Sequence, residues 1–205
     1  MRVAITGGNS GFGHSMAMAW QENGHTVDNF SRSNGYDIAD THHIVNAVRD
    51  YDMFINNAYS AEDGFAQTEI LYHLFQIWQG QDKFIMNIST EQTNRWLQHT
   101  DQGVKPLPWE QGQRRLNYRT TKVALEDAHQ FLTQQNDLPK MIIVKPAILD
   151  TTRTNFVPRD NDQRCKMDPD QVAKWLYTTW QHHKDFFVSE ISVRPLDWYR
   201  SKDTV

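Results

Sequence analysis

Tyr118 and Lys122 have the residue types and the spacing that acid–base chemistry requires. Residues four apart in an α-helix lie on the same face, so the phenol and the amine would be neighbours. A free phenol has a pKa of about 10 and is a poor base at neutral pH, but a nearby ammonium favours its charged form. The pair could therefore serve in general acid–base catalysis. The alternative is an ordinary pair of side chains on a helix surface.

A glycine-rich turn near the start of the chain could hold a diphosphate. The apolar run at residues 3–5 predicts a buried strand, Gly7, Gly8, Gly11 and Gly13 follow it, and a helical apolar pattern begins at once. Glycine lets the backbone approach a ligand closely, and a helix N-terminus supplies N–H groups and a positive dipole potential. The spacing Gly-x3-Gly-x-Gly differs from the general Gly-x-Gly-x2-Gly fingerprint. Without a ligand, the same residues would form an ordinary turn.

The end of the second predicted strand carries the sequence Ser31-Arg32-Ser33. In dinucleotide-binding folds the residue at this place meets the adenosine ribose, where an acid favours NAD and a base favours NADP. A guanidinium beside two hydroxyls suits a phosphate dianion, and Asp28 lies too early in the strand to be the ribose acid. The sequence therefore predicts NADP, with NAD as the less favoured cofactor. The alternative is a solvent-exposed arginine at a strand end.

Short apolar strands alternate with amphipathic helices along the chain. Strands are predicted at residues 3–5, 26–31, 36–40, 53–55, 83–88, 141–145 and 187–193. Helices are predicted after the glycine-rich turn and at residues 41–49, 67–78, 116–135 and 171–180, with Thr41 and Asp168 as N-caps. This alternation is typical of an α/β fold, a doubly wound parallel sheet that binds its ligand at the carboxyl ends of its strands. The polar residues 91–117, which contain two prolines, are expected to form an excursion near that site.

Composition sets the broad class. A chain of 205 residues with a net charge of −4 fits a single domain over residues 1–205, and it has no basic stripe for nucleic acid. Cys165 is the only cysteine, which argues against disulfides and cysteine metal sites and favours a cytoplasmic location. No apolar run is long enough to span a membrane, and the first strand leaves no room for a signal peptide. The adjacent histidines at 42–43 and 182–183 would point in different directions on helices, so no metal site is predicted.

Several motifs occur in a fixed order along the chain. They are Thr6-Gly-Gly-Asn-Ser-Gly-Phe-Gly13, Asp37-Ile38, Asn56-Asn57-Ala58, Tyr118-Arg-Thr-Thr-Lys122, Pro146-Ala-Ile-Leu-Asp-Thr151, Asp168-Pro-Asp-Gln-Val-Ala173 and Glu190-Ile-Ser-Val-Arg-Pro195. Over nearly its whole length the chain thus resembles the short-chain dehydrogenase/reductase family. The order carries the resemblance, because Tyr-x3-Lys alone is common by chance. The chain departs from the family pattern at Tyr59 and Ala147, which stand where the family motifs have glycine.

The resemblance implies a Rossmann-like fold and hydride transfer between a nicotinamide cofactor and a carbonyl or secondary-alcohol substrate. It implies that Tyr118 exchanges a proton with the substrate oxygen, that Lys122 also holds the nicotinamide ribose, and that a hydroxyl from Thr90 or Ser89 binds the same substrate oxygen. Tyr118, Lys122 and a further set of residues are expected to bind the cofactor: Thr6, Gly7, Asn9, Ser10, Gly11, Phe12, Gly13, Ser31, Arg32, Asp37, Ile38, Asn57, Ala58, Pro146, Ile148 and Thr151.

Other departures keep alternatives open. Many family members carry an asparagine on the helix before the fifth strand, thought to anchor a proton-relay water, and residues 60–81 contain no match; Gln76, His73 or a backbone carbonyl could substitute. The long gap before Tyr118 is closer to sugar-nucleotide reductases and epimerases, which form a second hypothesis. A third hypothesis is a cofactor-binding sensor without turnover. The family also implies a homodimer or homotetramer.

Overall fold

The computed structural model describes residues 1–59, 64–91, 93, 109–135, 138–151, 166–183 and 188–195, without the side chains of residues 109–112 and 115. In this part of the chain the backbone forms one six-stranded sheet with the order β2-β1-β3-β4-β5-β6. The strands are β1 (Arg2–Thr6), β2 (Thr26–Phe30), β3 (Met53–Asn56), β4 (Phe84–Ile88), β5 (Lys140–Pro146) and β6 (Glu190–Val193), and every neighbouring pair is parallel. The predicted parallel sheet is therefore confirmed.

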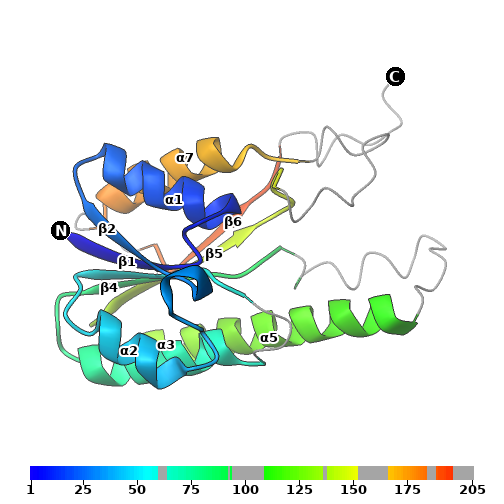
Figure 1. The fold of residues 1–205 in the computed structure, drawn as a ribbon, viewed down its shortest axis with the longest axis horizontal. Coiled ribbons are helices and arrows are strands. Elements are labelled where there is room, and N and C mark those ends of the chain that lie inside the picture. The colour runs from blue at the N-terminus through cyan, green and yellow to red at the C-terminus, as the bar shows by residue number, and fades with distance from the viewer. Residues whose placement is uncertain are drawn as a thin grey trace.

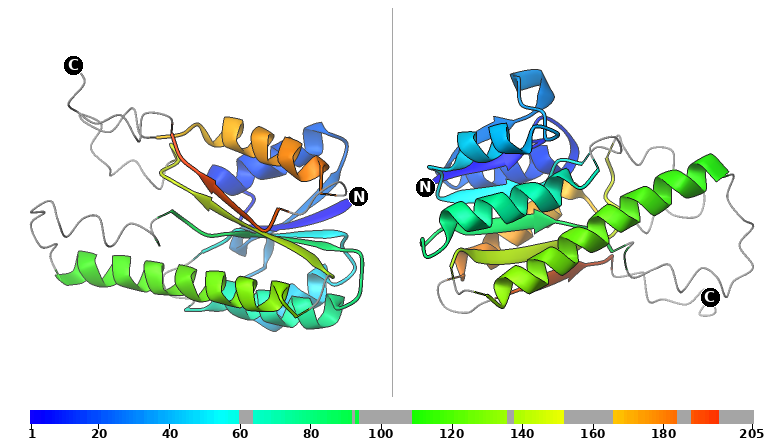
Figure 2. Two further views of the ribbon diagram at one scale, coloured as in Figure 1. Left: turned by 180° about the vertical axis from the view of Figure 1, so that it is seen from behind. Right: turned by 90° about the horizontal axis from the view of Figure 1, so that it is seen from below.

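Helices cover both faces of the sheet. Helices α1 (Gly11–Glu22) and α7 (Pro169–Gln181) lie on one face, and α2 (Thr41–Val48), α3 (Ala66–Trp78) and α5 (Trp109–Thr133) lie on the other (Figure 1). Viewed from the second face, α5 crosses the sheet beside α3 and extends beyond the strand ends (Figure 2). This is the doubly wound arrangement predicted from the alternation of strands and helices.

Successive side chains of each strand point to opposite faces of the sheet, so the core consists of two layers. Val3 and Ile5 of β1 pack with α1 and α7, whereas Ala4 between them packs toward α2 and α3. Large buried side chains anchor each layer, with Trp20 on the first face and Trp78 on the second. Both faces of the sheet are buried, which is why its strands are almost continuous apolar runs.

The predicted strand at residues 36–40 is wrong. After β2, residues Arg32–Asn34 form a 3-10 turn (η1), which ends at Gly35 in the left-handed conformation (φ 84°). The chain then runs irregularly, and Tyr36 packs edge-on against Phe30 with ring centroids 4.7 Å apart. The N-cap of α2 is Asp40 rather than Thr41, since the Asp40 carboxylate accepts the His43 N–H at 3.0 Å. A short apolar segment between polar residues fits a strand or a buried loop equally well, which is the source of the error.

Helix α5 begins at Trp109, so the predicted helix start at residue 116 is wrong. Residues 109–117 have no apolar periodicity, but most of them are good helix formers such as Glu, Gln and Arg. Residues 92 and 94–108 of the predicted excursion, and residue 187 of the last predicted strand, lie outside the described part of the chain.

Candidate active site

A cleft of about 670 Å³ opens at the carboxyl ends of the strands. It is lined by the glycine-rich turn, by the loops after β2, β3, β4 and β5, and by α5. Every predicted site residue except Thr6 lies on its wall, including Asn57, Ala58, Pro146 and Ile148. The structure thus brings together the residues of separate sequence motifs in one place.

The glycine-rich turn lies directly before α1. Its backbone is too tightly turned for larger side chains, which lets a ligand come close to it. Gly7 and Gly11 have positive φ angles of 71° and 54°, which favour glycine. A Cβ on Gly13 would lie 2.3 Å from the Gly7 carbonyl oxygen, so only glycine fits there. The first N–H groups of α1 lack partners within the helix, and Ser10 and Phe12 line the cleft beside them. This donor set and this tight turn fit a diphosphate.

Thr6 is buried beneath the turn and does not line the cleft. Its Oγ1 accepts the N–H groups of Asn57 and Ala58, both at 3.0 Å. The Asn57 side chain in turn donates to the Thr6 carbonyl at 3.0 Å. Thr6 therefore joins the end of β1 to the end of β3. It bonds to Asn57 and Ala58, which line the cleft, and does not lie in the cleft itself as expected for a cofactor contact.

Polar groups surround the end of β2. Asn9 Nδ2 donates to Ser31 Oγ at 2.7 Å and to Ser33 Oγ at 2.5 Å. Arg32, between these serines, is exposed and lines the cleft. Asp28 lies elsewhere, since its carboxylate accepts the Tyr51 hydroxyl at 2.8 Å. As the sequence predicted, the side chains at the strand tip are hydroxyls and a guanidinium rather than an acid.

Asp37 and Ile38 also line the cleft, at its Arg32 end. Asp37 Oδ1 accepts the Ala39 N–H at 3.1 Å, and Ile38 is 8% exposed. Phe30 and Tyr36 form part of the same wall and were not predicted as site residues. Tyr36 directly precedes Asp37 in the sequence, which was the available signal for this residue.

Tyr118 and Lys122 share one face of α5, as predicted, and meet Tyr59 at the cleft. The rings of Tyr59 and Tyr118 are edge-to-face with centroids 4.7 Å apart. The Lys122 Nζ lies 5.7 Å from the centroid of Tyr118 and 5.6 Å from that of Tyr59. Lys122 is 3% exposed and donates to Gln67 Oε1 at 2.7 Å and to the Ile88 carbonyl at 2.6 Å. The ammonium is therefore held in place beside the two phenols.

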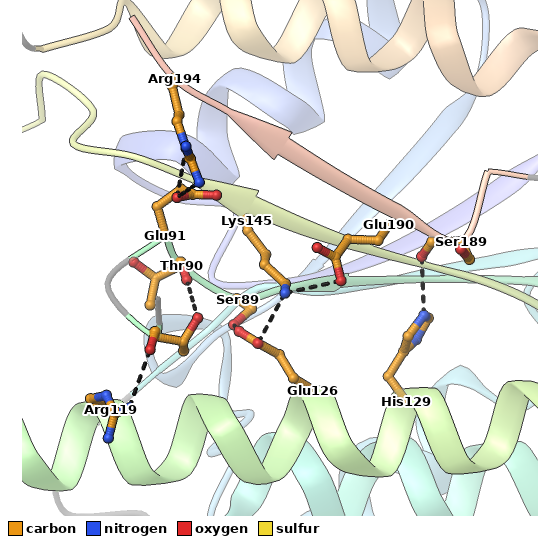
Figure 3. A network of polar contacts seen from close by, with 11 residues as sticks. Ser89, Thr90, Glu91, Arg119, Glu126, His129, Lys145, Ser189, Glu190 and Arg194 are labelled. Atoms are coloured by element: carbon orange, nitrogen blue, oxygen red, sulfur yellow. Dashed lines mark hydrogen bonds and ion pairs between the residues drawn. The ribbon is translucent and has the colours of Figure 1, made fainter. Parts of the chain in front are cut away.

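The two hydroxyls after β4 have different surroundings. Ser89 and Thr90 both line the cleft, but the Ser89 hydroxyl donates to the Glu126 carboxylate. Glu126 also pairs with Lys145 at 3.1 Å, and Lys145 pairs with Glu190 at 2.9 Å (Figure 3). Burial alone would lower the pKa of Lys145, but the hydrogen bonds and charges of Glu190 and Glu126 outweigh it and raise this pKa. Ser89 is thus bonded to a charged network of the buried Lys145, the partly buried Glu126 and the exposed Glu190.

A second buried polar group lies further along α5. His129 Nε2 is 3.2 Å from the Ser189 carbonyl oxygen (Figure 3). Its Nδ1 is 3.3 Å from Asn87 Nδ2. Because a carbonyl can only accept, Nε2 carries the proton and Nδ1 accepts from Asn87. Burial lowers the pKa of His129 from 6.5 to about 4.

Of the substitutes considered for the family's asparagine, the two side chains lie elsewhere on α3, whereas a backbone carbonyl, that of Ile88, does accept from the Lys122 ammonium. Gln76 is exposed on α3, and His73 packs on His42 with centroids 4.8 Å apart. The side chain that the structure places on Lys122 is Gln67, which the sequence analysis did not name. Its position one residue into α3 carries no sequence signal for this contact.

Two searches of the described residues gave negative results. Among them no three His, Cys, Asp or Glu side chains come close enough together to hold a metal ion. No helix in the same part of the chain is long and apolar enough to cross a membrane.

Comparisons with known proteins point to one fold. No protein-family model and no curated protein matches the sequence. Among solved structures, the 3-alpha-hydroxysteroid dehydrogenase from Pseudomonas sp. B-0831, complexed with NADH, is 17% identical with a TM-score of 0.71, covering 100% of both chains. An alcohol dehydrogenase from Thermococcus sibiricus, complexed with 5-hydroxy-NADP, is 16% identical with a TM-score of 0.68, covering 96% of this chain and 97% of that one.

A short-chain dehydrogenase/reductase from Vibrio parahaemolyticus is 15% identical with a TM-score of 0.67, and the match covers 93% of this chain and 98% of that one. Sequence identities this low show that the backbone folds are similar, but they do not show that the chemistry is the same. The six-stranded parallel sheet, its helical layers and this broad coverage show that the chain has the fold of the short-chain dehydrogenases/reductases.

Proposed function

We propose that this protein is an NADP(H)-dependent oxidoreductase that transfers a hydride between a nicotinamide cofactor and a carbonyl or secondary-alcohol substrate. The observation that carries the proposal is the common cleft, whose wall includes both the glycine-rich turn and the Tyr118–Lys122 pair. A cofactor held by the turn would lie in the same cleft as the Tyr118–Lys122 pair, as hydride and proton transfer to one substrate require. Proteins of similar fold in complex with an NADP derivative and with NADH support a nicotinamide cofactor.

The chain's own residues fit that cofactor along the length of the cleft. The turn from Gly7 to Gly13 would hold the diphosphate, and Asp37 with Ile38 would contact the adenine. At the other end, the loop from Pro146 to Thr151 would hold the nicotinamide, with Lys122 on its ribose. Similar structures bind either NADP or NADH, so the preference for NADP rests on the groups at the end of β2. Arg32 and the neighbouring hydroxyls offer donors to a 2′-phosphate.

The cofactor, when bound, supplies or accepts the hydride at its nicotinamide ring. In the direction of carbonyl reduction, the Tyr118 hydroxyl gives its proton to the substrate oxygen and becomes a phenolate. The Lys122 ammonium stabilises that phenolate, because the two groups lie on one helix face. Alcohol oxidation reverses both steps.

Thr90 is the better candidate for the hydroxyl that binds the substrate oxygen. The Ser89 hydroxyl proton is directed at Glu126 and is not available to a substrate oxygen while that bond holds. Both side chains line the cleft and both have interaction partners, so the preference for Thr90 rests on the carboxylate that the Ser89 hydroxyl faces.

Binding and turnover of the wild-type protein test the proposal directly. Titrations with NADPH and NADH should show tighter binding of NADPH, and a panel of ketones, aldehydes and nucleotide sugars should contain a substrate. Tyr118→Phe should then lose most activity while keeping its affinity for NADPH. Binding of NADPH without turnover of any compound would contradict the enzyme and favour a sensor, whereas turnover of nucleotide sugars alone would favour the sugar-nucleotide alternative.

We also propose that the protein forms a homodimer or homotetramer through the face of α3 and α5. These helices lie side by side and expose large apolar side chains, with Tyr72 49% exposed, Ile77 38% and Phe131 62%. A protein interface would cover these exposed apolar side chains. The cytoplasmic location stays a prediction from the sequence.

A further inference from the structure

Gln67 is a buried side chain on α3 whose amide oxygen accepts a hydrogen bond from a catalytic amine. It is 7% exposed, and its Oε1 lies 2.7 Å from Lys122 Nζ. The Ile88 carbonyl, 2.6 Å from the same nitrogen, also accepts from it. Hydrogen bonds from an ammonium in a buried place are charge-assisted and stronger than those between neutral groups. The two bonds therefore decide where the amine lies and favour its charged form.

The neighbouring Asn56 fixes the orientation of the Gln67 amide. Gln67 Nε2 donates to the Asn56 carbonyl at 2.8 Å, and Asn56 Nδ2 donates to the Gln67 carbonyl at 2.9 Å. Because a carbonyl can only accept, the NH₂ of Gln67 must face Asn56 and its oxygen must face Lys122. The amide cannot rotate without breaking two bonds in a buried place.

The support continues across the sheet. Asn56 Nδ2 also donates to Asn87 Oδ1 at 3.0 Å, and Asn87 bonds to His129 on α5. Asn56 and Asn87 are fully buried at neighbouring positions of β3 and β4. Among the described residues the buried Asn56 Oδ1 has no hydrogen-bond partner, so the orientation of Asn56 is held by the two bonds that its NH₂ donates. Gln67 is thus the last member of a hydrogen-bonded chain that runs from His129 on α5 through Asn87 and Asn56.

We propose that Gln67 is the positioning residue of Lys122: it keeps the ammonium charged and close to Tyr118, and so sets the conditions under which Tyr118 exchanges its proton. The inference rests on the proposed function and deepens it. Gln67 touches the lysine rather than the substrate, and it does so by direct contact. Gln67 lies on α3, within the segment 60–81 that lacks the family's asparagine.

The variant Gln67→Met tests this role, because methionine has similar length and volume but no amide. Gln76→Met is the matched control, since Gln76 lies on the same helix and is exposed. A first readout needs no cofactor: in protein labelled with ¹⁵N-lysine, a buried ammonium with two acceptors should give a slowly exchanging NH₃⁺ signal in NMR spectra. Lys122→Met assigns that signal by its loss.

The expected result is that Gln67→Met broadens or removes the Lys122 signal, whereas Gln76→Met leaves it unchanged. With NADPH and a substrate from the panel, Gln67→Met should lower kcat by about tenfold to a hundredfold, which is the loss of one hydrogen bond to a charged group. The KM for the carbonyl substrate should change little, and the pH at which alcohol oxidation is half-maximal should move upward.

A purely structural role would lower the thermal midpoint of Gln67→Met without moving the pH profile. A folded Gln67→Met protein that keeps the NH₃⁺ signal, or that keeps both kcat and the pH profile of the wild type, would overturn the proposal. Loss of the signal in a protein that neither binds NADPH nor turns over a substrate would support the contact and contradict the proposed function, so the two failures are distinguishable.

Discussion

Acidification should destabilise this protein through His129, which lies beneath the candidate site. Its pKa is lowered by burial from 6.5 to about 4, and its two nitrogens have complementary partners only in the neutral form. A second proton on Nδ1 would face the NH₂ of Asn87, whose Oδ1 is already used by Asn56. Protonation therefore removes one bond of the hydrogen-bonded chain that leads to Gln67.

The magnitude follows from linkage. In the unfolded chain His129 has a pKa of 6.5 and is protonated below that pH. In the folded protein its pKa is about 4, so it takes up the same proton only at lower pH. The contribution of His129 to the free energy of unfolding is fully present above pH 6.5. It decreases as the pH drops from 6.5 to about 4 and changes no further at lower pH. Each pKa unit corresponds to about 1.4 kcal/mol, so the expected loss between pH 7 and pH 5 is about 2 kcal/mol.

Urea unfolding at pH 7, 6 and 5 measures this loss when the wild type is compared with His129→Gln. The variant should be less stable at pH 7, and its stability should fall by about 2 kcal/mol less than that of the wild type on going to pH 5. The exposed His14 provides the control variant His14→Gln, which should follow the wild type. A constant difference between wild type and His129→Gln over this range, or an NMR titration of His129 near pH 6.5, would refute the reasoning.

Four further outcomes are expected. Arg32→Ala should weaken NADPH binding by about tenfold or more in calorimetric titrations and leave NADH binding unchanged, because the lost bonds go to the extra phosphate. Gly13→Ala should abolish cofactor binding and lower the thermal midpoint, since its Cβ would lie 2.3 Å from a carbonyl oxygen of the same turn. Thr90→Val should reduce kcat by about a hundredfold, whereas Ser89→Ala should chiefly reduce stability, by about 1 kcal/mol. Phe131→Asp, at a position 62% exposed, should convert the oligomer to a monomer in light-scattering measurements.

Each of these expectations has a control or a contradictory result. Arg49→Ala, away from the cleft, should leave both cofactors bound as in the wild type. Normal NADPH binding by a folded Gly13→Ala protein would show that the turn does not hold the diphosphate. A greater loss of kcat in Ser89→Ala than in Thr90→Val would reverse the assignment of the substrate hydroxyl. Trp175→Asp, on the opposite face of the sheet, should leave the oligomer intact, and a monomeric wild type would contradict the proposed interface.

The fold could be predicted closely because its signals are local. Apolar runs such as Val3 to Ile5 form strands that are buried on both faces, and the glycine-rich turn marks where the first strand becomes a helix. The errors fell where local signals are ambiguous. Residues 36–40 look like a strand but pack as a loop, and the start of α5 has helix-forming residues without an apolar stripe.

Site residues could be predicted where a motif fixes the backbone, and could not where the contact joins distant segments. Tyr118 and Lys122 share a helix face because they are four residues apart, which follows from helix geometry alone. Gln67 and Lys122 are 55 residues apart, and Ser89 and Glu126 are 37 apart. No spacing rule connects such pairs.

The sequence by itself determined the parallel α/β class, the position of the glycine-rich turn and the shared helix face of Tyr118 and Lys122, since each depends on neighbours along the chain. The tertiary structure alone decided that Thr6 bonds to the end of β3, that Ser89 is bonded to the partly buried carboxylate of Glu126 and that Gln67 accepts from the lysine. The physical reason is that a buried polar atom takes its partner from whichever strand or helix packs beside it, and packing is a property of the whole fold.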